Sequence, residues 1–188
     1  MTVFVEANCF AAAAPQGQQR KRNPSPYILH PMEAAVICGT ISSDPEILAA
    51  AMLHDTVEDS GVRFEELEAR FGPRVAALVA SETENKRPEL PPAETWRLRK
   101  EESLETLAQA RDPGVKILWL GDKLANLRSI YPDWRKRGDE VWKAFNQKDP
   151  TQQAWYYRRI RDLLRSLRNT TAWQELDFYV REIFAEVP

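Results

Sequence analysis

The sequence predicts an all-α fold of about eight to ten helices. Seven glycines and thirteen prolines punctuate the 188 residues, and between them apolar residues recur at helical period rather than alternating as in strands. Hydrophobic residues make up 43% and charged residues 29% of the chain, which is ordinary globular usage and excludes a disordered or fibrous protein. We therefore expect one compact helical domain over residues 1–188.

Turn formers and capping residues set the expected helix ends in the first half. Pro15 ends the first helix because proline is not tolerated in a helix interior. The third helix has Ser43 or Asp44 as its cap, Pro45 at the favoured first position, and Gly61 as its C-terminal stop. We expect helices over about residues 3–14, 31–40, 45–59, 62–71 and 73–83, with a turn-rich loop at 22–26.

The second half is read in the same way. The proline-rich segment 84–92 is the most loop-like stretch in the middle of the chain, and Asp149-Pro150 precedes a further helix. Aromatic residues crowd this half, and we interpret them as core and helix-contact residues. We expect helices over about residues 93–110, 113–131, 136–146, 151–168 and 171–186.

Charge and cysteine content narrow the class of function. Lysine and arginine number 26 against 28 aspartate and glutamate, a net charge of −2, which argues against a dedicated nucleic-acid binder. Cys9 and Cys38 are too few for a disulfide framework and favour a reducing compartment. The N-terminus lacks a signal-peptide pattern, and no run approaches the ~18 apolar residues of a membrane span. We expect a cytoplasmic protein.

The last turn of the expected helix 45–59 gathers His54, Asp55, Glu58 and Asp59 after three apolar turns. Residues four apart share a helix face, so Asp55 and Asp59 would place like charges together. Glu58 and Asp59 also lie at the end of the helix where cations are favoured. A divalent cation would reverse both penalties, although an exposed acidic helix end beside a satisfied histidine explains the same pattern.

Two other positions offer further ligands. The chain has only two histidines. The one other than His54 is His30, which lies at the start of an expected helix. Asp122 lies in an otherwise apolar helix, where a carboxylate is costly to bury without a partner. An ion pair with arginine or lysine would also explain Asp122. Imidazole and carboxylate ligands together suit manganese, iron or zinc.

Three motifs follow one another along the chain: Tyr27-Ile28-x-His30-Pro31, His54-Asp55-Thr56-Val57-Glu58-Asp59 and Gly121-Asp122-Lys123-Leu124-x-Asn126-Leu127. In this order they resemble the HD-type hydrolase domain of the RelA/SpoT family, specifically its stand-alone small alarmone hydrolases of the metazoan SpoT-homologue type. The match runs from about residue 11 to residue 128. The resemblance implies a compact HD-domain helical bundle, with a motif core over about 11–130 and C-terminal helices over about 136–187 packing on it.

The resemblance also implies an activity. Enzymes of this family hydrolyse the 3′-diphosphate of guanosine tetraphosphate or pentaphosphate, (p)ppGpp, to GDP or GTP and pyrophosphate, and so degrade the alarmone of the stringent response. Glu58 and Asp59 match the acidic pair that orients or deprotonates the attacking water. One divalent metal ion, typically Mn²⁺, would be held by His30, His54, Asp55 and Asp122.

A strongly anionic nucleotide needs cations in its site. The segment containing Arg20 and Lys21 matches the family's Arg-Lys segment, whose side chains pack against the purine and phosphates. Asn126 and Ser129 match positions that touch the nucleoside. Arg97, Arg99 and Lys100 form a second basic cluster, and one of them could reach the leaving diphosphate, although an exposed helix face is the favoured explanation of that cluster. The expected partner is a small nucleotide, without nucleic acid or membrane, and a homo-oligomer is left open.

Two departures from the family pattern leave alternatives open. Pro15 replaces a common histidine, and Ala125 stands where the family usually has histidine or an aromatic residue, so we expect a changed nucleotide loop and an enlarged base pocket. In a second interpretation the protein has the same metal site but hydrolyses (p)ppApp, or removes the 2′-phosphate of NADPH. A third reading, from another class, is an inactive module that binds a nucleotide or a protein.

Overall fold

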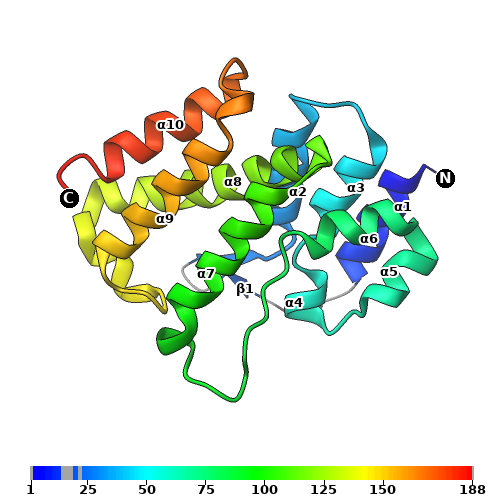
Figure 1. Cartoon of the computed structure of the whole chain (residues 1–188), viewed down its shortest axis with the longest axis horizontal. Coiled ribbons are helices and arrows are strands. Elements are labelled where there is room, and N and C mark those ends of the chain that lie inside the picture. Colours follow the sequence, from blue (N-terminus) through cyan, green and yellow to red (C-terminus); the bar gives the residue numbers. More distant parts are fainter. Residues whose placement is uncertain (1, 14–18, 21–22, 188) are drawn as a thin grey trace.

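The computed structural model describes residues 2–13, 19–20 and 23–187. Within that part of the chain the regular structure is almost entirely helical, so the all-α prediction is confirmed (Figure 1). The N-terminal helices are α1 (Val3–Ala13), α2 (Leu29–Gly39), α3 (Pro45–Leu53), α4 (Thr56–Ser60), α5 (Phe64–Phe71) and α6 (Pro73–Ala80). They are followed by α7 (Pro92–Gln109), α8 (Pro113–Arg137), the 3₁₀ helix η1 (Gly138–Ala144), α9 (Pro150–Leu163), the 3₁₀ helix η2 (Arg165–Leu167) and α10 (Thr171–Ile183).

A two-stranded hairpin includes residues 23–26 of the segment 22–26, which the sequence indicated to be a loop. Strand β1 (Gln19–Arg20) pairs antiparallel with β2 (Asn23–Pro26). The two prolines of β2 lack backbone donors, so the pattern of this segment is that of a turn rather than a strand. Pairing with β1 is what makes these residues extended.

Helix α3 lies at the centre of the N-terminal half and packs against α1, α2, α6 and α8. Its residues Ala49, Ala50 and Ala51 are all fully buried. Small side chains allow neighbouring helix backbones to approach closely, which explains how one short helix contacts four others. In Figure 1, α7 lies beside α9, and α10 packs on α9 and α8 at the C-terminal end of the molecule.

The expected continuous helix over 45–59 is wrong, because α3 ends at Leu53 and α4 begins at Thr56. The Thr56 hydroxyl donates a 2.7 Å hydrogen bond to the Leu53 carbonyl. A side chain that takes over a helical carbonyl competes with the backbone ladder and favours a break. The expected stop at Gly61 is confirmed, since this residue has the left-handed φ of 69° that suits a C-terminal cap.

The helices expected over 113–131 and 136–146 differ from those in the structure. Helix α8 continues through Pro132 to Arg137, and the segment after it is the 3₁₀ helix η1. Proline removes one helical hydrogen bond, which is why the sequence predicted an end there. Aromatic contacts stabilise this stretch, since the Tyr131 ring stacks on Trp134 at 5.9 Å and contacts Tyr179 of α10 at 4.9 Å between centroids.

Within the described ranges, none of the helices combines the length and apolar character that a bilayer span requires.

A surface ion-pair network joins the N-termini of α3 and α8 to α6, and it carries the first prediction. The Arg74 guanidinium lies 2.7 Å from Asp44 and 2.8 Å from both Glu46 and Asp112. Hydrogen bonds from Arg74 lower the pKa values of Asp44 and Asp112. A carboxyl group whose pKa is lower in the folded protein stabilises the fold at pH values above its unfolded-state pKa. That stabilisation is lost as the pH falls through the folded-state pKa.

We expect Arg74→Gln to reduce the free energy of unfolding by about 1 kcal/mol at pH 7, a modest figure because all four side chains are about one-third exposed. The deficit should narrow as the pH falls below about 4, where the carboxylates become protonated. Urea unfolding of both proteins from pH 7 to pH 3 measures this. A deficit that stays constant across the range would contradict the ionic origin.

Candidate active site

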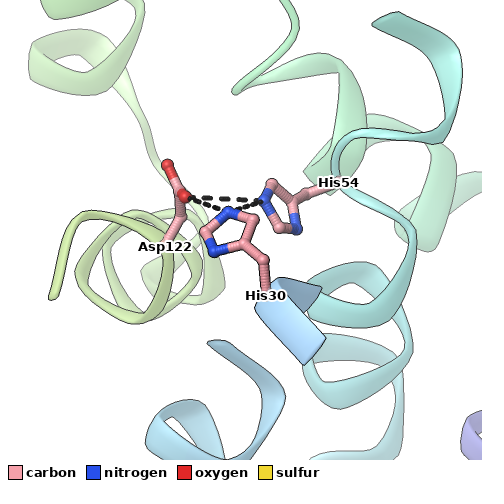
Figure 2. Close-up of side chains that lie close together, drawn as sticks. All are labelled: His30, His54 and Asp122. Carbon is pink, nitrogen blue, oxygen red and sulfur yellow. Dashed lines mark hydrogen bonds and ion pairs between the residues drawn. The ribbon is translucent and has the colours of Figure 1, made fainter. Parts of the chain in front are cut away.

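Two histidines and two aspartates from three parts of the chain meet in one cluster. His30 lies at the start of α2, His54 and Asp55 form the turn between α3 and α4, and Asp122 lies in α8. Figure 2 shows the imidazoles of His30 and His54 and the carboxylate of Asp122 pointing toward one another. All three are buried. The four residues that the sequence predicted as metal ligands are therefore brought together.

The separations between their polar atoms match the edges of a coordination polyhedron. His30 Nε2 lies 2.9 Å from Asp122 Oδ1 and 3.3 Å from His54 Nε2. Asp55 Oδ2 lies 3.2 Å from His54 Nε2 and 3.6 Å from His30 Nε2. Ligand atoms about 2.1 Å from a common ion lie about 3.0–3.4 Å from one another. This donor set therefore fits one divalent cation.

The protonation of His54 supports the same conclusion. Its Nδ1 lies 2.8 Å from the Ala51 carbonyl oxygen, and a carbonyl only accepts, so Nδ1 carries the proton. Whenever the ring is neutral, its lone pair is therefore on Nε2, which faces His30 and the two carboxylates. Fixing the tautomer through the second ring nitrogen is the usual arrangement for a metal-binding histidine.

The electrostatics of the cluster show how strongly it favours positive charge. Burial opposes the charging of His54, but Asp55 and Asp122 together raise its pKa well above the ordinary value. Burial likewise opposes the ionisation of Asp122, yet Lys123 and the two histidines hold its pKa well below the ordinary value. A cation among these groups would be stabilised in the same way as the proton on His54.

Asp55 is positioned by the break between α3 and α4. It is the residue before α4, and its side chain is one-quarter exposed, so it lies at the edge of the cluster that faces solvent. The Tyr27 hydroxyl donates a hydrogen bond to Asp55 Oδ2. Tyr27 belongs to the first sequence motif, but the sequence did not indicate this role.

Glu58 lies one turn into α4, outside the cluster itself. The Glu84 backbone N–H donates a 2.6 Å hydrogen bond to Glu58 Oε1, and Lys86 Nζ lies 3.2 Å from Oε2. Burial raises the pKa of Glu58. Glu58 and His54 do not lie on one continuous helix, because the chain turns between them. The side chain of Asp59, the other predicted catalytic acid, lies outside the described residues.

A pocket of about 260 Å³ lies beside the cluster and combines cations, amides and aromatic rings. Asn126 lines it and donates a 2.7 Å hydrogen bond to Asp122 Oδ1, which links the pocket to the metal-ligand cluster. Lys100 Nζ lies 4.7 Å from the centre of the Tyr156 ring. The other charged and aromatic lining residues include Arg99, Lys123, Trp96, Phe145 and Tyr157.

The remaining predicted substrate contacts separate into three groups. Lys100 and Asn126 line the pocket, whereas Arg97 does not, because its guanidinium lies over the Trp155 ring and bonds Glu101 and Gln152. Ser129 is half-buried on α8 and is not a lining residue. Lys21 and the side chain of Arg20 lie outside the described residues, as does Pro15.

Three further residues lie elsewhere than the sequence predicted, or have contacts that the sequence did not predict. Ala125, expected to enlarge a base pocket, is fully buried and does not line this one. Lys123 was read only as part of a motif, yet it pairs with the carboxylates of Asp122 and Glu82. Glu82 is buried at the end of α6. The glutamate that directly follows the apolar run of α6, two residues after its end, was the available signal.

The chain is similar in sequence to proteins of known family. A family model described as HD domain matches residues 7–151. The chain is 36% identical over 188 residues to the guanosine-3′,5′-bis(diphosphate) 3′-pyrophosphohydrolase MESH1 of Danio rerio, covering 98% of this chain and 93% of that protein. The Homo sapiens counterpart is 41% identical over 131 residues, with 68% and 69% covered. An Aquifex aeolicus enzyme of the same activity is 36% identical over 115 residues, and this chain spans 16% of its length.

Two solved structures resemble the whole molecule. One is a metazoan ortholog of SpoT described as hydrolysing ppGpp, with a TM-score of 0.73, 30% identity, and coverage of 99% of this chain and 96% of that one. The other is a Listeria monocytogenes protein with a TM-score of 0.72 and 31% identity, covering 84% and 99%. The similarity therefore includes the C-terminal helices as well as the residues that form the cluster.

Proposed function

This chain belongs to the HD-domain family, and on that premise we propose that it hydrolyses the 3′-diphosphate of (p)ppGpp, releasing pyrophosphate and leaving GDP or GTP. The observation that carries the proposal is near-full-length similarity to enzymes of this name and to a ppGpp-hydrolysing ortholog of SpoT. The convergence of His30, His54 and Asp122 supplies the chemistry that such a reaction needs. We take the whole chain as one domain, and its cytoplasmic location stays a prediction.

His30, His54, Asp55 and Asp122 would hold the divalent cation. We propose Mn²⁺, because the mixture of imidazole and carboxylate ligands without thiolates suits it. When bound, such an ion polarises the phosphoryl group and lowers the pKa of water. Asn126 and Tyr27 orient two of the ligands by hydrogen bonds to Asp122 and Asp55.

Glu58 is the proposed general base. Its raised pKa brings the carboxylate closer to the pH at which it accepts a proton efficiently. The Glu84 N–H and Lys86 hold the side chain in place. Asp59 is assigned to the same acidic pair from the family pattern.

The pocket beside the cluster is the proposed nucleotide site. Arg99 and Lys100 line it and share the single carboxylate of Glu84, so the pair keeps a net positive charge for phosphate groups. Asn126 supplies an amide for the nucleoside. Trp96 and Tyr157 offer flat apolar surface for a base or ribose. From the family pattern, Arg20, Lys21 and Ser129 remain proposed contacts. Arg97 also stays a proposed contact, although its guanidinium packs over the Trp155 ring.

The experiment that tests the function measures pyrophosphate release from ppGpp with added Mn²⁺ and with excess EDTA. We expect turnover with Mn²⁺ and a loss of at least about 10²-fold in EDTA, because the ion stabilises charge in the transition state by several kcal/mol. Parallel reactions with pppApp and NADPH rank the alternative substrates. Tight binding of ppGpp without turnover under any divalent metal would contradict the proposal and favour the inactive module.

A further inference from the structure

A buried glutamate lies behind the candidate metal centre, and the proposed reaction does not use it. Glu82 follows α6 in a turn, and its side chain is only 4% exposed. The turn is attached to α8 by the Trp119 indole, whose Nε1 donates a 3.3 Å hydrogen bond to the Ser81 carbonyl. A carboxylate so deeply buried is costly without a charge partner.

That partner is Lys123. Its Nζ lies 2.9 Å from Glu82 Oε1 and also pairs with Asp122 Oδ2. The ammonium lies 4.7 Å from the centre of the Trp119 ring, so the same tryptophan that anchors the turn also supports the lysine. Lys123 is thus held between two carboxylates.

The two oxygens of Asp122 have different partners. Oδ1 faces His30 Nε2 at 2.9 Å and His54 Nε2 at 3.5 Å and accepts a hydrogen bond from Asn126, while Oδ2 is occupied by Lys123. Lys123 and Asn126 together set which oxygen Asp122 presents to the histidines. A cation so near a metal ligand also repels a metal ion, and it draws the carboxylate toward itself.

Glu82 offsets that repulsion. With neutral imidazoles, Asp55, Asp122 and Glu82 carry three negative charges against one positive charge on Lys123, and a divalent ion makes the set neutral. Without Glu82 the same set would carry an excess positive charge once the ion is bound. Buried charges are tolerated when they are compensated in this way.

We propose that Glu82 is a positioning residue for the metal centre, acting through Lys123 to hold Asp122 Oδ1 toward the ion and to balance the lysine charge. The inference rests on the metal-ligand set of the proposed function. Outer residues that orient metal ligands typically contribute a factor of about 10–100 in metal affinity.

The test is Glu82→Gln, which keeps the size of the side chain and removes its charge. Mn²⁺ binding is measured by titration calorimetry at pH 8 without any nucleotide. We expect the dissociation constant to rise by about tenfold. Glu175→Gln is the matched control, because Glu175 is a partly buried carboxylate whose partner is Arg128 and not a member of the ligand cluster; its Mn²⁺ affinity should match that of the wild type.

A merely structural role predicts a different result, namely a lower melting temperature in EDTA with unchanged Mn²⁺ affinity, and that result would overturn the inference. The action through Lys123 is tested in a Lys123→Met background, where adding Glu82→Gln should change the affinity by less than about twofold. A full tenfold effect in that background would also overturn it.

The calorimetric test of Glu82 contains no substrate, so its result does not depend on whether the protein hydrolyses ppGpp. A wild type that binds Mn²⁺ but releases no pyrophosphate rejects the reaction and leaves the role of Glu82 to be decided by calorimetry. A wild type that binds no Mn²⁺ rejects the role of Glu82.

Discussion

Replacing Asp122 with asparagine is expected to remove most bound Mn²⁺ and to lower turnover of ppGpp by about 10³-fold or more, corresponding to about 4 kcal/mol. Asp122 Oδ1 lies within 3.5 Å of both histidine Nε2 atoms. An amide keeps the shape of the carboxylate but carries no negative charge, so both attraction for the ion and compensation of Lys123 are lost. Replacing His54 with alanine should have the same effect, because it removes the ligand whose tautomer is set by Ala51.

Metal content after purification with Mn²⁺, calorimetric titration and steady-state pyrophosphate release are the three measurements. Asp162→Asn is the matched control, because Asp162 is an exposed carboxylate on α9 that pairs with Arg161; it should leave metal content and turnover unchanged. Circular dichroism establishes that each variant is folded. An Asp122→Asn protein that binds Mn²⁺ as tightly as the wild type would refute the ligand assignment.

Replacing Gly121 with alanine is expected to lower the free energy of unfolding by about 1–3 kcal/mol. A Cβ at this position would lie 2.5 Å from Cys38 Sγ and 2.8 Å from the Ala34 carbonyl oxygen. The sulfur can rotate, but the carbonyl belongs to the backbone of α2, so α2 and α8 must separate. Because α2 carries His30 and α8 carries Asp122, weaker Mn²⁺ binding should accompany the loss of stability.

The control is Gly39→Ala, because a Cβ there would meet only Leu48, at an ordinary 3.8 Å. That variant should be as stable as the wild type or slightly more stable, since alanine is favoured over glycine in a helix by up to about 1 kcal/mol. Combining Gly121→Ala with Cys38→Ala should recover only part of the stability, because the Ala34 carbonyl remains. Chemical denaturation measures all four proteins, and an unaffected Gly121→Ala would show that the two helices are not closely packed.

Much of the fold followed from local signals. Proline and glycine positions predicted the helix boundaries near Pro45, Gly61 and Pro73 because their backbone preferences act within a few residues. The prediction of one continuous helix over 45–59 was wrong, because the local pattern there was misleading. Apolar periodicity does not register that the Thr56 hydroxyl takes the Leu53 carbonyl, and that contact creates the turn that carries His54 and Asp55.

The proposed metal ligands could be chosen from residue type and order, since His30, His54, Asp55 and Asp122 fall within three motifs. Which basic residues line the pocket could not be predicted in this way. Arg97 and Lys100 are three positions apart on α7, yet only Lys100 lines the pocket, because Arg97 packs on Trp155 of α9 while Lys100 packs on Tyr156. Which face of α7 meets the pocket is decided by its packing against α9.

By itself, the sequence determined that this protein is helical and that a few histidines and carboxylates are available for a metal, because those properties depend on residue type and local spacing. Only the tertiary structure decided that α2, α8 and the turn after α3 meet so closely that four donors converge. It also decided that Glu82 lies behind them against Lys123. Long-range packing brings these residues together, and no spacing along the chain encodes that distance.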